Sequence, residues 1–139
     1  MIAWLKGILL EKSASQIILN VKGVGYEVAI SATTFFGLPD EGMEYACFIQ
    51  TIVREDTFSL FGFGEKQEKA AFRMLIKISG IGPRVALGIL SSTTVTDFVR
   101  IINSKESKLL VKFPGIGKKT AERLIIELSD KITDLLDNN

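Results

Sequence analysis

Apolar and polar residues alternate through much of the first 64 residues, as they do in half-buried β-strands. In residues 16–22 the odd positions are apolar, and in residues 26–30 the even positions are apolar, so each segment has one hydrophobic face. A β-branched and aromatic run extends from Tyr45 to Val53, and residues 57–61 continue the pattern after a short polar break. About five strands in so short a stretch predict a small closed β-barrel of the OB type.

Glycine and acidic residues mark the turns between these strands. Gly23-Val24-Gly25 and Leu38-Pro39-Asp40-Glu41-Gly42 both have the composition of turns. Arg54, Glu55 and Asp56 separate two strand-like runs, so we expect these three residues at the tip of a hairpin.

The hydrophobic period changes near Glu65 from two residues to the spacing of a helix. Ala70, Ala71, Met74, Leu75 and Ile78 show this spacing, and residues 97–102 and 109–112 predict two short helices. A final helix is predicted from about Lys118 to Leu136, with a buried stripe formed by Ala121, Leu124, Ile125, Leu128, Ile132 and Leu135. We therefore predict an α+β protein with a barrel domain in residues 1–64 and an all-helical domain in residues 65–139.

The helical part contains an internal repeat. Residues 75–86 align without a gap on residues 110–121, at a constant offset of 35. Each copy has a helix, then the pattern apolar-x-Gly-apolar-Gly, then a second helix. Two copies of one supersecondary unit, a helix-hairpin-helix, are therefore predicted.

This repeat has the chemistry of an anion-binding site. Glycines permit a tight hairpin that another molecule can approach closely, and we expect Gly82 and Gly117 to need positive φ. The helix that follows offers unpaired N–H groups and the positive end of its dipole, which stabilise a DNA phosphate. Pro83 suits the first helical position, and two isoleucines fill the space between paired helices. The predicted phosphate-binding residues are Gly80, Ile81, Gly82, Arg84, Gly115, Ile116, Gly117, Lys118, Lys119 and Arg123.

Backbone contacts position a protein on DNA without reading bases, so we expect recognition of structure rather than sequence. The net charge of +1 hides an asymmetry that agrees with this expectation. Residues 1–64 have four basic and seven acidic side chains, a net charge of −3, and the remaining thirteen basic and nine acidic side chains give +4. A basic face in the second half is compatible with DNA binding, although ordinary solvated surface has the same composition.

The remaining composition excludes several kinds of chemistry. Cys47 is the single cysteine and there is no histidine, so an internal disulfide and the usual zinc ligand sets are excluded. We expect no cofactor and no metal. No apolar run approaches the roughly 18 residues of a membrane span, and the N-terminus lacks a signal-peptide pattern. These observations predict a soluble, unprocessed cytoplasmic protein with no membrane partner.

The chain resembles the RuvA family of Holliday junction-binding subunits along its whole length. The residues that carry this resemblance are Met1-Ile2, Gly23–Val28, Val53–Asp56, Leu60–Phe63, Lys66–Glu68, Leu75–Lys77, Gly80–Pro83, Ala86-Leu87 and Leu110–Leu124. These motifs are more specific than the hairpins, which occur in many polymerases, ligases and glycosylases.

The resemblance implies a non-catalytic homotetramer that holds a four-way junction open during recombination and repair. It implies RuvB, an ATPase that drives branch migration, and RuvC, a resolvase, as partners. It places the hairpin of Glu55 and Asp56, with Arg54 beside them, at the four-fold axis, where the carboxylates form an acidic pin in the junction. Members of the family usually continue into a small third domain that docks RuvB, whereas this sequence stops at Asn139; the resemblance thus implies a fragment, a natural truncation or a form without RuvB coupling.

Three other functions fit parts of the sequence. A helix-hairpin-helix DNA glycosylase would use Lys119 as its nucleophile and Asp137 as the assisting carboxylate, but no glycine or proline between them forms the loop of that family. A single-strand binder would stack bases on barrel aromatics, namely Trp4, Tyr26, Tyr45, Phe48, Phe58, Phe61 and Phe63. A purely structural adaptor would bind no DNA.

Overall fold

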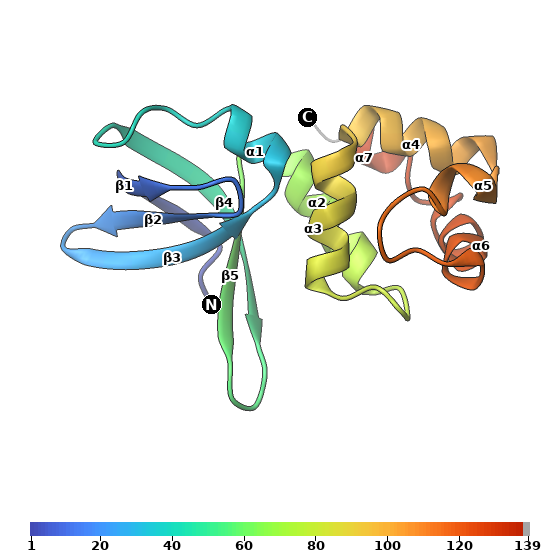
Figure 1. Ribbon diagram of the computed structural model, residues 1–139, viewed down its shortest axis with the longest axis horizontal. Coiled ribbons are helices and arrows are strands. Elements are labelled where there is room, and N and C mark those ends of the chain that lie inside the picture. The colour runs from blue at the N-terminus through green and yellow to red at the C-terminus, as the bar shows by residue number, and fades with distance from the viewer. Residues whose placement is uncertain (138–139) are drawn as a thin grey trace. The chain divides into compact units, whose positions relative to one another are not determined.

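The computed structural model describes residues 1–137. Its internal contacts divide the chain into two compact units, Met1–Lys69 and Ala70–Asn139. The first unit contains the strands and the second contains most of the helical segment (Figure 1).

The first unit is a closed five-stranded barrel, as the sequence predicts. Its strands follow the order β1-β2-β3-β5-β4, in which the β3–β5 pair is parallel and the other pairs are antiparallel. A core of aliphatic side chains fills the barrel, among them Leu9, Leu19, Val28 and Ile49, each fully buried. The strands are β1 (Trp4–Lys12), β2 (Gln16–Val21), β3 (Val24–Ile30), β4 (Glu44–Val53) and β5 (Phe58–Phe63).

The turn between β2 and β3 lies one residue before its predicted position. Lys22 and Gly23 both have positive φ, of 51° and 92°, as the central residues of a type I′ hairpin turn require. The Gly23 N–H donates to the Asn20 side chain at 2.7 Å. Val24 therefore begins β3, opposite Val21, and is not a turn residue.

A short helix, α1 (Ala32–Phe36), follows β3 and was not expected from the sequence. Its two threonines have low helix propensity, and five residues are too few to show a helical period. Its N-terminus is instead stabilised by Ser31, whose hydroxyl accepts a hydrogen bond from the Thr34 N–H at 3.1 Å.

The beginning of α2 (Lys66–Ile76) belongs to the barrel unit because Glu68 is bound there. The Glu68 carboxylate accepts hydrogen bonds from the hydroxyls of Ser31 at 3.0 Å and Thr34 at 2.5 Å. Burial raises the pKa of this carboxyl, and the two hydroxyl hydrogen bonds partly offset that effect. The units consequently divide after Lys69, five residues beyond the boundary expected from the change of period.

The second unit is all-helical, as predicted, and each of its helices contributes to one apolar core. Phe72, Leu90, Phe98, Leu110 and Leu124 are fully buried in it. After α2 the helices are α3 (Pro83–Ser92), α4 (Val95–Ser104), α5 (Ser107–Leu110), α6 (Lys118–Leu128) and α7 (Asp134–Asp137). None of the helices described is by itself long and apolar enough to cross a membrane, and the pair α3–α4, which would suffice together, is bent by 99°.

The prediction of one continuous final helix is wrong, because α6 ends at Leu128. The Ser129 hydroxyl donates to the Ile125 carbonyl, a bond that competes with helical pairing. Beyond that point the backbone bonds join residues three apart, such as Asp134 to Lys131, so the chain tightens into turns before α7. The predicted stripe is nevertheless buried at five of its six positions, and Ile125 is half-buried.

Candidate nucleic-acid interface

The two hairpins predicted from the repeat have the same backbone hydrogen bonds. In the first, the N–H groups of Ile78, Ile81 and Ala86 donate to the carbonyls of residues 75, 78 and 82. In the second, the N–H groups 35 positions later donate to the equivalent carbonyls, 110, 113 and 117, with distances of 2.9–3.2 Å. The internal repeat of the sequence is thus a repeat of backbone geometry.

The four hairpin glycines adopt two conformations, and our assignment of positive φ to Gly82 and Gly117 is wrong. Positive φ occurs at the first glycine of each hairpin, 95° at Gly80 and 86° at Gly115. Gly82 has φ −91° and ψ 178°, and Gly117 has φ −88° and ψ 178°, which is extended backbone open to any residue. The turn itself is completed at the first glycine, so the second has no need of a left-handed conformation.

The second glycine of each hairpin is the N-cap of the helix that follows. A Cβ added at Gly82 or Gly117 would meet no protein atom within 4 Å, so the space in front of both is open. Neither N-cap offers a side chain to the first turn of its helix, whereas Ser31 caps α1 and Thr94 caps α4 through their hydroxyls. The first N–H groups of α3 and α6 are therefore left for another acceptor.

The isoleucine between the two glycines is buried in both hairpins. Ile81 is 4% exposed and Ile116 is 5% exposed, although both neighbouring glycines of each hairpin are exposed. Each isoleucine side chain anchors its hairpin in the apolar core and leaves the backbone outside. The predicted contribution of these two residues is thus structural, and the glycine backbone is what a ligand can reach.

The two hairpins also pack against each other reciprocally. A Cβ at Gly80 would lie 3.2 Å from Oγ1 of Thr120 on α6, and a Cβ at Gly115 would lie 3.1 Å from Cγ2 of Val85 on α3. Val85 and Thr120 are equivalent positions of the repeat, 35 residues apart. This exchange of equivalent contacts relates the hairpins by an approximate two-fold axis. The sequence offset could have indicated Val85 and Thr120, but only as a pair of equivalent positions.

Exposed basic side chains stand at the start of both helices, with more of them at the second. Arg84 follows Pro83 at the start of α3, and Lys118 and Lys119 begin α6; all three basic side chains are exposed. Arg123 has a different environment from the one expected, because its guanidinium donates to the Ser79 carbonyl at 3.3 Å. It connects α6 to the first hairpin and retains its charge beside both.

The basic surface does not extend across the outer face of α6. A shallow depression of about 390 Å³ there is lined by Lys119, Glu122, Arg123, Ile126 and Glu127. Its two carboxylates balance its two cations, so an anion is favoured only at the hairpin end of the helix.

The acidic hairpin lies in the other unit, between β4 and β5. Arg54, Glu55 and Asp56 are exposed at its tip, as predicted, and the Arg54 N–H closes the turn on the Thr57 carbonyl at 2.9 Å. The strands extend beyond the barrel before this turn, so the carboxylates stand clear of the barrel surface (Figure 1).

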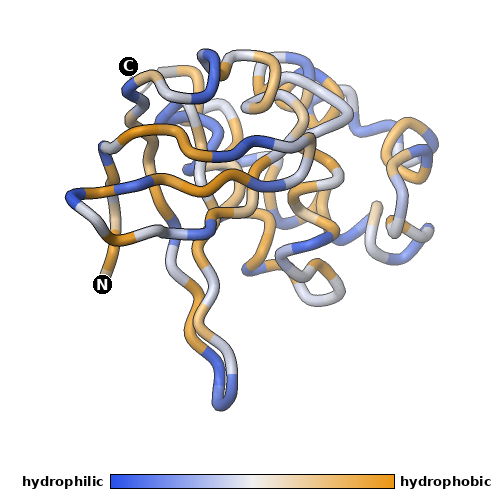
Figure 2. The backbone as a smooth tube through the Cα atoms, turned by 60° about the vertical axis from the view of Figure 1, so that its left-hand side comes forward, coloured by the Kyte–Doolittle hydropathy of each residue, from blue (hydrophilic) through white to orange (hydrophobic). Residues whose placement is uncertain are grey.

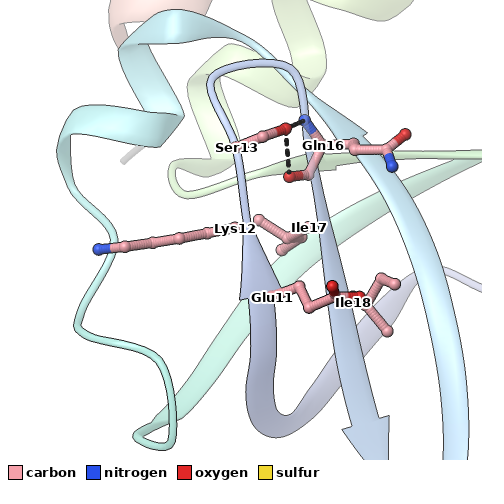
Figure 3. A pocket seen from close by; sticks show the side chains of 6 residues that line it. All are labelled: Glu11, Lys12, Ser13, Gln16, Ile17 and Ile18. Atoms are coloured by element: carbon pink, nitrogen blue, oxygen red, sulfur yellow. Dashed lines mark hydrogen bonds between the residues drawn. The ribbon is translucent and has the colours of Figure 1, made fainter.

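A second depression, of about 150 Å³, lies beside the turn that joins β1 and β2 (Figure 3). The Ser13 hydroxyl and the Gln16 backbone hydrogen-bond to each other, and the Lys12 ammonium donates to the Pro39 carbonyl at 3.0 Å. These contacts within the chain explain the polar groups of the depression, and we assign it no ligand.

The features required by the alternative functions are distributed as follows. Lys119 lies in the first turn of α6, and the side chain of Asp137 is outside the described part of the chain. Of the seven barrel aromatics, Trp4 and Phe58 are exposed, Phe63 is buried and the others are half-buried. A base-stacking face would therefore rest on two separate side chains.

Two family models match the chain, and together they cover both units. The model of the RuvA N terminal domain matches residues 1–62, which contain the barrel and the acidic hairpin. The model of the SAM-like helix-hairpin-helix tandem matches residues 72–130, which contain both hairpins.

Similar proteins share nearly the whole chain. The Holliday junction branch migration complex subunit RuvA of Histophilus somni is 50% identical over 135 residues, covering 97% of this chain and 66% of that protein. The subunits of the same name from Shewanella piezotolerans and Yersinia enterocolitica are 47% and 49% identical, covering 99% and 97% of this chain and 67% and 66% of theirs. The chain thus spans about two thirds of the length of these curated relatives. It belongs to the RuvA family.

Proposed function

We propose that this protein binds four-way DNA junctions through the phosphate backbone, as a non-catalytic subunit. The observation that carries the proposal is the pair of helix N-termini capped by Gly82 and Gly117. Their hydrogen bonds repeat, their caps have no side chain, and the space before them is open. Each therefore presents N–H donors and a helix dipole to one phosphate. Gly80, Gly115 and the buried Ile81 and Ile116 hold the two sites in place.

The proposed assembly is a homotetramer that works with a motor and a nuclease. The relatives are named as subunits of a branch migration complex, and we infer from this name that RuvB is the motor and RuvC the nuclease that resolves the junction. With four subunits, eight hairpins contact phosphates together. About 0.9 counterions released per contact give a slope of log K against log salt near −7. A slope near −2 would contradict the tetramer.

We assign the acidic hairpin the role of keeping the centre of the junction open. Glu55 and Asp56 repel phosphates, so they cost affinity but exclude a continuous duplex from the centre. The double variant Glu55→Gln with Asp56→Asn should bind DNA more tightly and discriminate less between junction and duplex. Weaker binding by a folded double variant, or an unchanged preference, would show that the pair is ordinary turn surface.

A gel-shift series tests the proposed function directly. A four-way junction, a duplex and a single strand of equal length are each titrated with the chain and challenged with excess unlabelled duplex. The proposal requires a strong preference for the junction. Equal binding of duplex would leave a generic hairpin module, and preference for the single strand would favour base stacking on the barrel.

A further inference from the structure

The acidic hairpin carries two large apolar side chains that the barrel does not cover. Val53 and Phe58 lie directly opposite each other on β4 and β5, and each is 61% exposed. The opposed pair on the same face, two residues nearer the barrel, is Thr51 and Leu60, which are 4% and 7% exposed. Because alternate residues of a strand share a face, the core-facing surface of the hairpin continues beyond the barrel and ends at Phe58.

The position of this pair is fixed by the turn. Phe58 is the first residue of β5, directly after the Thr57 carbonyl that closes the turn with the Arg54 N–H. The hairpin is hydrophilic at its tip and hydrophobic along its stem (Figure 2). An aromatic ring thus stands beside two carboxylates at the end of a protruding hairpin, where it has little core to join. A large exposed apolar side chain in such a place marks a contact with another molecule.

The carboxylates restrict what that molecule can be. Glu55 and Asp56 repel phosphate, so the part of a DNA strand that can approach the ring closely is the base, which is uncharged and has a π-face. Unpaired bases are available only where strands part, and on the proposed function this hairpin stands at that place. We propose that Phe58, supported by Val53, stacks on a DNA base that is unpaired at the centre of the junction. This inference rests on the proposed function.

Another exposed aromatic provides a matched control. Phe36 on α1 is 82% exposed, and its ring contacts Phe35 edge to face at a centroid distance of 5.7 Å. It belongs to the same barrel unit but not to the acidic hairpin. Replacing Phe36 by alanine removes as much exposed aromatic surface as replacing Phe58, without changing the hairpin.

The experiment uses the whole chain and junctions with 5-iodouracil either at the crossover or in the middle of an arm. Long-wavelength ultraviolet light crosslinks this base to an aromatic ring on which it stacks, and mass spectrometry locates the crosslinked peptide. We expect a crosslink at Phe58 from the crossover base and none from the arm base. Phe58→Ala should abolish this crosslink and weaken junction binding at least about fivefold, since base stacking contributes that much. Phe58→Tyr should retain both, and Phe36→Ala should match the wild type.

The outcomes separate this inference from the proposed function. Equal binding of junction and duplex by the wild type would refute the proposed function and this inference with it. A wild type that prefers junctions but crosslinks elsewhere, or a Phe58→Ala variant that crosslinks and binds as the wild type does, would refute the stacking alone. A lower molar mass of Phe58→Ala in light scattering without DNA would also overturn it, by showing that the pair joins two copies of the chain.

Discussion

The same substitution, glycine to alanine, should have opposite effects on stability at two positions of one hairpin. Gly80 has φ 95°, and an added Cβ would lie 3.2 Å from Oγ1 of Thr120. Gly82 has extended backbone and no protein atom within 4 Å of the added Cβ. Gly80→Ala therefore changes the folded protein, whereas Gly82→Ala changes only the surface that faces a ligand.

The expected magnitudes follow from these two environments. Left-handed backbone costs an alanine about 1–2 kcal/mol, and the contact with Thr120 adds to the loss at Gly80. At Gly82 alanine fits the native backbone and restricts the unfolded chain, which stabilises the protein by about 0.4–1 kcal/mol. In a unit of this size 1 kcal/mol shifts the Tm by about 4–8 °C, so thermal unfolding resolves both signs.

Junction binding should fall in Gly82→Ala even though the variant is more stable. The methyl group stands in front of the α3 N-terminus, and a hydrogen bond to a charged group is worth about 1.5–3 kcal/mol, so the loss of one bond weakens binding at least about tenfold. Fluorescence anisotropy with a labelled four-way junction measures this effect. Gly88 is the matched control, because it lies within α3 and its added Cβ also meets no atom within 4 Å. If Gly82→Ala binds as tightly as Gly88→Ala, or is less stable than the wild type, the reasoning is wrong.

Three further predictions concern charge and burial. Lys118→Ala should reduce the slope of log K against log salt by about 1 without changing base preference, and an unchanged slope, as expected for Lys108→Ala outside the hairpins, would contradict its phosphate contact. Burial raises the pKa of Glu68 in the folded state. The free energy of unfolding of the wild type relative to Glu68→Gln should therefore be highest below the ordinary carboxyl pKa and fall as the pH rises through the folded-state value; urea titrations that show the opposite trend would refute this sign. Burial raises the pKa of the Cys47 thiol to about 12 at 1% exposure, so a thiol reagent near pH 8 should label it far more slowly in the folded chain than in denaturant, and equal rates would show that the barrel opens.

The barrel strands could be predicted because alternation alone determines which side chains face inward. Ile17 and Leu19 on one strand and Val28 and Ile30 on the next are all buried, as the odd and even positions predict. The helix α1 could not be predicted, because its five residues are positioned by contacts from distant parts of the chain. Glu68 lies 37 residues after Ser31 in the sequence, and no local pattern indicates that hydrogen bond.

The location of the candidate site could likewise be predicted, but its detailed geometry could not. The constant offset of 35 predicts two equivalent hairpins because each copy repeats the same glycines and apolar positions. Which glycine has positive φ depends on how the turn closes, and sequence spacing does not determine it. The contact of Arg123 with Ser79 joins different copies of the repeat, so it depends on the packing of one hairpin against the other.

The approximate two-fold symmetry of the hairpins is a symmetry of backbone and not of chemistry. Position by position, the first hairpin has Pro83 and Arg84 where the second has Lys118 and Lys119. Proline has no N–H, so the first helix offers one donor fewer as well as one charge fewer. The shared geometry should hold two phosphates in equivalent ways, whereas most of the salt dependence should come from the second hairpin. Two sites of equal shape and unequal charge allow the pair to grip DNA firmly on one side and adjust on the other as strands move past.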